Sequence, residues 1–102
     1  MVDHELNELR REFLQEADEK AREIAQTLTA DRSSETLDRL AYLAHQLKGS
    51  GGSYGYQRIS TDAAELEKAF EALARGESSD ESRIRAHVDG LQSEIAQRMA
   101  EL

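Results

Sequence analysis

The residues best suited to chemistry are a histidine and a nearby lysine that precede a run of glycines. His45 and Lys48 are followed by glycines at positions 49, 51, 52 and 55. An imidazole is a competent nucleophile near neutral pH because a large fraction of it is unprotonated. A lysine ammonium beside it can pair with phosphoryl oxygens. The pattern therefore makes His45 a candidate nucleophile, with Lys48 placed to pair with an anionic group.

The glycines are unfavourable if this segment is helical. Each one costs about 0.8–1 kcal/mol relative to alanine in a helix interior, so Gly49, Gly51 and Gly52 together cost roughly 2–3 kcal/mol. Helical geometry places Gly49 one turn beyond His45 and Gly52 nearly two turns beyond it. The surface beside the imidazole would then lack side chains, and we expect a partner to approach there.

An apolar stripe defines the helix that carries His45. Its members are Leu37, Leu40, Ala44, Leu47, Gly51 and Tyr54. At about 100° per residue, this stripe predicts a helix that persists to about Tyr54 and turns His45 towards water. The residues expected around His45 as a docking surface are Ala41, Tyr42, Gly49 and Gly52. Gly55 is expected to adopt the left-handed conformation of the following turn.

Three more stripes accompany this one, and together they predict an all-α fold. The first contains Leu6, Leu9, Phe13, Ala17, Ala21, Ile24 and Leu28. The expected helices span residues 3–29, 34–54, 57–75 and 79–101. Because the connections are short, we expect an up-down-up-down antiparallel four-helix bundle that forms a single domain over residues 1–102.

Capping residues set the expected helix ends. The predicted N-terminal caps are Asp3, Ser33 or Ser34, and Ser78, which has Glu81 at capping-box spacing. Gly76 is suited to the left-handed position that follows the third helix.

Composition excludes several classes of function. The chain has 102 residues, no cysteine and a formal net charge of -8. Disulfides, thiolate catalysis and cysteine-ligated zinc are therefore excluded. The negative charge disfavours nucleic acid and anionic lipid, and no apolar run approaches the roughly 18–20 residues that span a bilayer. We expect a soluble, cytoplasmic monomer without a signal peptide, and the ends at Met1 and Leu102 favour a free-standing protein.

The motif resembles that of a known family. The pattern His45-x-Leu47-Lys48-Gly49-Ser50, with the later Gly55, resembles the signature of histidine-containing phosphotransfer (HPt) domains. With Gly55-Tyr56 it is also similar to the phosphorylation domain of chemotaxis histidine kinases. The segments Phe13-Leu14-x-Glu16-Ala17 and Leu66-Glu67 resemble the family's first and third helices. The pair Gly51-Gly52 departs from the family, in which many members have Ser or Ala.

The resemblance implies a phosphoryl carrier. A sensor histidine kinase, or the aspartyl phosphate of a receiver domain, would donate to His45, and the aspartate of a response-regulator receiver would take the group away. The family pattern implies that Lys48 stabilises the phosphate and that Gly49 leaves room for the receiver. It also implies that the receiver supplies Mg²⁺, so this chain would need no metal or cofactor.

Two alternatives remain open from the sequence. The chain could be a phosphoacceptor domain cut from a chemotaxis-type kinase, or a non-catalytic helical interaction module, although the latter leaves the pattern around His45 unexplained. We expect no ATP-binding or autokinase activity, because no glycine-rich phosphate loop is present. His4 and His87 lack a Lys-Gly neighbourhood and are expected to be exposed or structural. The sequence names neither the cognate partners nor the reactive imidazole nitrogen.

Overall fold

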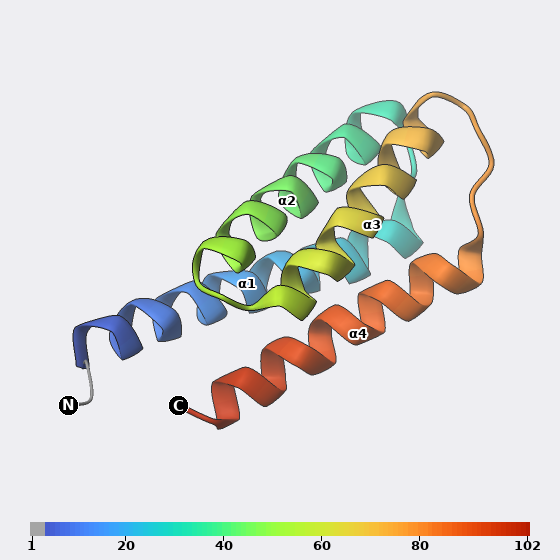
Figure 1. The fold of residues 1–102 in the computed structure, drawn as a ribbon. Coiled ribbons are helices and arrows are strands. Elements are labelled where there is room, and N and C mark those ends of the chain that lie inside the picture. The colour runs from blue at the N-terminus through green and yellow to red at the C-terminus, as the bar shows by residue number, and fades with distance from the viewer. Residues whose placement is uncertain (1–3) are drawn as a thin grey trace.

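The computed structural model describes residues 4–102, which form a bundle of four helices (Figure 1). Helix α1 spans His4–Ala30, α2 spans Ser34–Ser53, α3 spans Gln57–Ala74 and α4 spans Glu81–Ala100. Consecutive helices pack on one another, and α4 packs back on α1. This arrangement is the predicted up-down-up-down bundle. In the part of the chain that the structure describes, no helix has the length and apolar character needed to cross a membrane.

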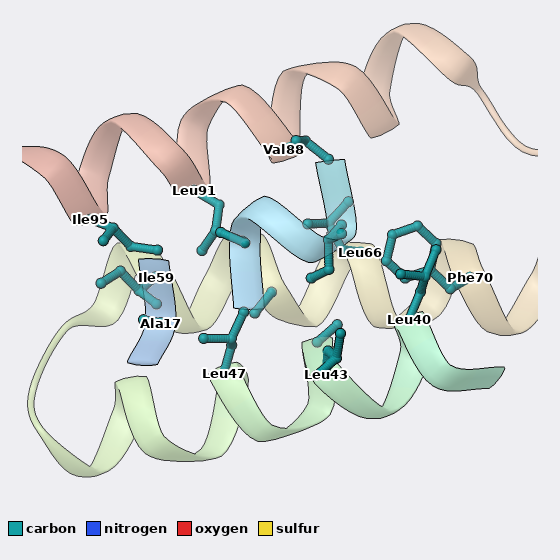
Figure 2. Packing of buried hydrophobic residues seen from close by; sticks show 14 of the residues in the cluster. Ala17, Leu40, Leu43, Leu47, Ile59, Leu66, Phe70, Val88, Leu91 and Ile95 are labelled. Atoms are coloured by element: carbon teal, nitrogen blue, oxygen red, sulfur yellow. The ribbon is translucent and has the colours of Figure 1, made fainter. Parts of the chain in front are cut away.

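The core lies along the bundle axis and receives side chains from all four helices (Figure 2). Leu43 and Leu47 of α2, Leu66 of α3 and Leu91 of α4 all point into the space between the helices. Each of these leucines is at most 2% exposed. Burial of a leucine side chain stabilises the fold by about 1.5–3 kcal/mol, so these side chains hold α2 and α3 in the register that the site requires.

The apolar stripes predicted most of the core but not its width. Leu14 and Leu43 are buried although neither belongs to a predicted stripe. Each helix contacts two neighbours, so its buried face is wider than a single row of residues. The prediction that Leu9 belongs to the core was wrong, because its side chain is 47% exposed.

The α1–α2 connection is capped as expected. Ser33 is the N-cap of α2, and its hydroxyl accepts a hydrogen bond from the backbone N–H of Thr36. Asp31 supports this turn by accepting from the Thr36 hydroxyl at 2.6 Å and from the Ser33 backbone N–H at 3.0 Å. These hydrogen bonds lower the pKa of the Asp31 carboxyl below its ordinary value. The predicted cap at Asp3 lies outside the described residues.

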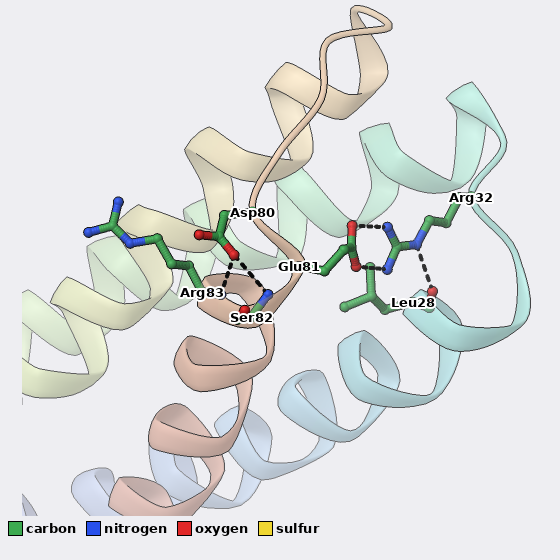
Figure 3. A network of polar contacts seen from close by, with 6 residues as sticks. All are labelled: Leu28, Arg32, Asp80, Glu81, Ser82 and Arg83. Atoms are coloured by element: carbon green, nitrogen blue, oxygen red, sulfur yellow. Dashed lines mark hydrogen bonds and ion pairs between the residues drawn. The ribbon is translucent and has the colours of Figure 1, made fainter.

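The predicted start of α4 was wrong. The helix begins at Glu81 with Asp80 as its N-cap, and Asp80 Oδ1 accepts from the backbone N–H groups of Ser82 and Arg83 (Figure 3). The proposed capping box needed the Glu81 carboxylate to turn back towards Ser78. Instead, Glu81 pairs with Arg32, which lies two residues beyond the end of α1.

That Arg32–Glu81 pair joins the end of α1 to the start of α4. Two N–O contacts of 2.7 Å connect the guanidinium and the carboxylate, and Arg32 Nε also donates to the Leu28 carbonyl at 3.0 Å (Figure 3). The hydrogen bonds to Arg32 lower the pKa of Glu81. Because both side chains are substantially exposed, the pair is expected to contribute no more than about 1 kcal/mol.

Two glycines end helices as predicted. Gly55 and Gly76 have φ values of 82° and 81°, the left-handed region that follows a helix C-terminus. After α2, the N–H of Tyr56 bonds back to the carbonyl of Gly51 at 2.8 Å, which turns the chain directly into α3. The observed helix ends otherwise differ from the predicted ones by a residue or two, and α2 ends at Ser53 with Tyr54 as its C-cap.

Candidate functional site

His45 faces solvent from the middle of α2, as its position off the apolar stripe predicted. Its side chain is 62% exposed. The imidazole is nevertheless held in place, because Nδ1 lies 2.8 Å from Oε2 of Glu67 on the neighbouring helix α3. A carboxylate accepts but does not donate a hydrogen bond, so Nδ1 carries the hydrogen.

Glu67 also binds Lys48. Its second oxygen, Oε1, lies 2.8 Å from Lys48 Nζ, so one carboxylate joins the two residues that the sequence motif singled out. The Glu67 side chain is only 15% exposed. Burial raises the pKa of the Glu67 carboxyl, but the hydrogen bonds and positive charges of Lys48 and His45 outweigh burial and hold that pKa below its ordinary value. Glu67 is therefore a carboxylate at neutral pH.

The contact with Glu67 distinguishes the two imidazole nitrogens. With its hydrogen on Nδ1, the neutral ring has its lone pair on Nε2. The hydrogen bond to Glu67 engages the Nδ1 side of the ring, and Nε2 is left for an incoming group. The arrangement also stabilises positive charge on the ring when Nε2 forms a bond, because Glu67 is negatively charged.

The three glycines within α2 have different surroundings. A Cβ atom added to Gly49 would meet nothing within 4 Å, whereas one added to Gly51 would lie 3.2 Å from both Ile59 Cγ2 and the Ser60 backbone nitrogen. A Cβ at Gly52 would be 3.6 Å from the Ser60 hydroxyl oxygen. Gly49 therefore leaves open space beside His45, while Gly51 lets α2 and α3 approach closely.

Ser60 ties the two helices together at the same level. Its hydroxyl donates a hydrogen bond of 2.8 Å to the backbone carbonyl of Lys48. Together with the close approach at Gly51, this contact holds the end of α2 against the first turn of α3. The register of the two helices, which brings His45 and Lys48 to Glu67, is set partly here.

A shallow hollow lies beside His45 on the side away from the glycines. It has a volume of about 300 Å³ and is lined by Asp38, Ala41, Tyr42, His45, Glu67 and Glu71. Tyr42 is 53% exposed and its hydroxyl accepts a hydrogen bond from Gln46. Ala41 and Tyr42 thus border His45 on one side, and Gly49 and Gly52 extend the surface on the other. The larger hollow of about 730 Å³ lies at the end of the bundle and contains Gly55 but not His45.

Glu67 and Ser60 are site residues that the sequence patterns did not identify. A signal for Glu67 was present: it is 22 positions from His45, and the α2–α3 turn lies midway between them. In antiparallel helices joined by a tight turn, residues equally distant from the turn lie side by side. Ser60 had no comparable signal, because a serine on a helix surface is common.

The described residues offer no evident metal centre. Within residues 4–102, no group of three or more histidine, cysteine, aspartate or glutamate side chains is placed to hold a metal ion. Both oxygens of Glu67 are already engaged, by a lysine and an imidazole N–H.

Comparison with known proteins identifies the family. The family model described as "Hpt domain" matches residues 8–102. The chain has no significant match among curated proteins or among solved structures. The matched region includes all of α2, α3 and α4 and most of α1, and therefore every residue of the site around His45. The chain belongs to the Hpt domain family, whose members are phosphocarriers that act in histidine phosphotransfer within phosphorelays.

Proposed function

We propose that His45 accepts a phosphoryl group on Nε2 and passes it to the aspartate of a response-regulator receiver domain. The donor would be a sensor histidine kinase or the aspartyl phosphate of another receiver. The observation that carries this proposal is the exposed His45 imidazole, which Glu67 holds through Nδ1 at 2.8 Å while Nε2 is left free. No other histidine in the described residues combines this geometry with an adjacent lysine and an open glycine.

The chemical step uses groups that are already in place. The Nε2 lone pair attacks phosphorus, and the bond from phosphorus to the donor's leaving atom breaks. Nδ1 keeps its hydrogen, so the phosphorylated ring carries a positive charge that faces the Glu67 carboxylate. Transfer onwards reverses these bond changes when a receiver aspartate attacks the same phosphorus. The chain contributes a positioned nucleophile and local electrostatics.

Lys48 has two roles in this proposal. In the unphosphorylated protein it pairs with Glu67 at 2.8 Å and helps to keep that carboxylate ionised. Its side chain is 39% exposed and flexible, so its ammonium can turn towards phosphoryl oxygens once they are attached to the neighbouring His45. A phosphoryl group with two negative charges competes effectively with Glu67 for that cation.

The receiver would dock over the surface around Nε2. Gly49 presents open space there, so the receiver's active site can approach the imidazole without meeting a side chain. Ala41, Tyr42 and Gly52 would form the surrounding contact, with Tyr42 as the most exposed large apolar group among them. Mg²⁺ would be held by the receiver, as the family resemblance implies, and both Glu67 oxygens already contact His45 and Lys48.

The proposal is tested by reaction with phosphoramidate, a small phosphoryl donor, followed by peptide mapping under conditions that preserve acid-labile phosphohistidine. We expect an acid-labile group on Nε2 of His45, with the nitrogen assigned by NMR. In His45→Gln, the label in that peptide should be absent while the helical content of the protein is unchanged. A wild-type protein without label at position 45, or with label on Nδ1, would contradict the proposal.

A further inference from the structure

A second imidazole–carboxylate pair lies between α3 and α4, away from the His45 site. His87 Nδ1 is 3.0 Å from Oδ1 of Asp62, a contact between the same kinds of atoms as His45 Nδ1 and Glu67 Oε2. The two residues are 25 positions apart, on either side of the α3–α4 loop. We propose that His87 is a second phosphoacceptor, which takes a phosphoryl group on Nε2 from small phosphoryl donors.

Asp62 is an unusual residue for a purely structural contact. It is the one polar or charged side chain among the buried residues of the described chain, at 8% exposure. Its second oxygen, Oδ2, is buried and has no hydrogen-bond partner within residues 4–102. A buried carboxylate with an unsatisfied oxygen is unfavourable unless positive charge develops nearby. Positive charge on the His87 ring would supply that compensation.

Gly90 makes room for this carboxylate. A Cβ atom at position 90 would lie 3.1 Å from Asp62 Oδ2, so a side chain there would crowd Asp62. Gly90 lies on α4 just beyond His87, in the middle of a helix where glycine is otherwise unfavourable. The glycine thus lowers the helix propensity of α4 at the position where Asp62 lies close to His87.

The contact with Asp62 leaves Nε2 as the ring nitrogen that can react. Asp62 accepts the hydrogen on Nδ1, which places the lone pair of the neutral ring on Nε2. The His87 side chain is 31% exposed, so part of the ring reaches solvent even though Asp62 is nearly covered. A hollow of about 260 Å³ adjoins the ring, which is ample for a phosphoryl group.

A cationic side chain that could bind a phosphoryl group lines this hollow. Arg83 lies one turn before His87 on the same helix and also lines the hollow. Its guanidinium makes no hydrogen bond or ion pair in the part of the chain that is described, so it is free to bind phosphoryl oxygens, the role that Lys48 has beside His45. Two acidic residues line the hollow as well. Asp80 is engaged by backbone N–H groups at the start of α4, and Glu65 pairs with Lys68 at 3.5 Å.

The reaction is balanced with phosphoramidate as the donor. The Nε2 lone pair of His87 attacks phosphorus, and the phosphorus–nitrogen bond of phosphoramidate breaks. Ammonia departs, because the donor's nitrogen already carries its additional proton. Nδ1 retains its hydrogen towards Asp62, so the product ring is positively charged beside a buried carboxylate. An acyl phosphate would react in the same way, with a carboxylate as the leaving group.

The test uses His45→Gln, which removes the first acceptor and leaves His87 unchanged. After treatment with phosphoramidate, this variant should still gain one acid-labile phosphoryl group, mapped to Nε2 of His87. Adding His87→Gln should reduce the rate of labelling at least tenfold. Adding Arg83→Gln should slow it several-fold. The matched control adds His4→Gln at the exposed start of α1 and should leave the rate unchanged.

Three results would overturn the inference: no label on the His45→Gln variant, label that maps to His4, or label on Nδ1 of His87. The circular dichroism spectrum of each variant must match that of the wild type, and Asp62→Asn provides a second route if His87→Gln does not fold. Asp62→Asn keeps the size of the side chain but removes its charge, and should slow labelling of His87 several-fold. Label at position 45 in the wild type tests the proposed function separately, so either idea can fail alone.

Discussion

Replacement of Glu67 by alanine should slow the phosphorylation of His45 while leaving the bundle folded. The change removes the acceptor that holds Nδ1–H at 2.8 Å and the negative charge that faces the ring. A charge-assisted hydrogen bond contributes about 1.5–3 kcal/mol. The His45 side chain is 62% exposed, so water screens the contact and the lower end applies. A loss of about 1.4 kcal/mol in the transition state corresponds to a roughly tenfold slower reaction.

The same substitution should have a limited effect on stability. Exposed and partly exposed ion pairs contribute about 0–1 kcal/mol each, and Glu67 makes two such contacts, so the free energy of unfolding should fall by no more than about 2 kcal/mol and the melting temperature by no more than about 8–16 °C. The rate at position 45 is measured by peptide mapping during phosphoramidate treatment, so that label on His87 is counted separately, and the ring tautomer is measured by ¹⁵N NMR. Glu71→Ala is the matched control, because Glu71 is exposed on the same helix face and makes no hydrogen bond to His45 in the described residues. A Glu67→Ala variant that reacts at the wild-type rate with an unchanged tautomer would refute the role of Glu67.

Three further predictions concern the glycines and the pH dependence. Gly49→Leu should leave phosphoramidate labelling of His45 within about twofold of wild type but slow transfer to a receiver at least tenfold. The reason is that only a protein partner needs the open space at Gly49, and equal slowing of both reactions would contradict this prediction. Gly51→Val should lower the free energy of unfolding by about 1–3 kcal/mol, because the valine side chain would press on Ser60. Gly49→Ala should raise the free energy of unfolding by up to about 1 kcal/mol, because alanine is more favourable than glycine in a helix. Thermal melts of the two variants would show both effects. The pKa of Glu67 is lowered in the folded state, so the contribution of its carboxylate to stability is present at neutral pH. That contribution is lost as the pH falls below the ordinary value of 4.5 and through the folded pKa. The free energies of unfolding of wild type and Glu67→Gln, measured in urea, should therefore differ at pH 7 and converge in acid, and a difference that stays constant would contradict this prediction.

The sequence predicted the fold because the information for it is local. Apolar residues at helical spacing specified four buried faces, and glycines at positions 55 and 76 marked the turns. The exceptions depend on contacts between distant segments. Glu81 could not complete a capping box because Arg32 from the α1–α2 connection engages it, and Leu9 is exposed although it continues the stripe of α1.

The candidate site was predictable in part for the same reason. The motif located His45, Lys48 and the clear surface at Gly49 within one helix, where spacing determines proximity. Glu67 and Ser60 lie on the next helix, and their contacts depend on the register that the α2–α3 turn imposes. The glycine at position 51, which departs from the family pattern, is explained by the close approach of Ile59 and not by partner docking.

Onward transfer from phosphorylated His45 to a receiver domain is the sharpest test of the proposed function. The protein would be labelled with phosphoramidate, separated from the donor, and mixed with purified receiver domains in the presence of Mg²⁺. We predict that the label leaves Nε2 of His45 and arrives on a receiver aspartate, and that His45→Gln supports no transfer. Label that stays on wild-type His45 with every receiver, or equal transfer from His45→Gln, would contradict the account.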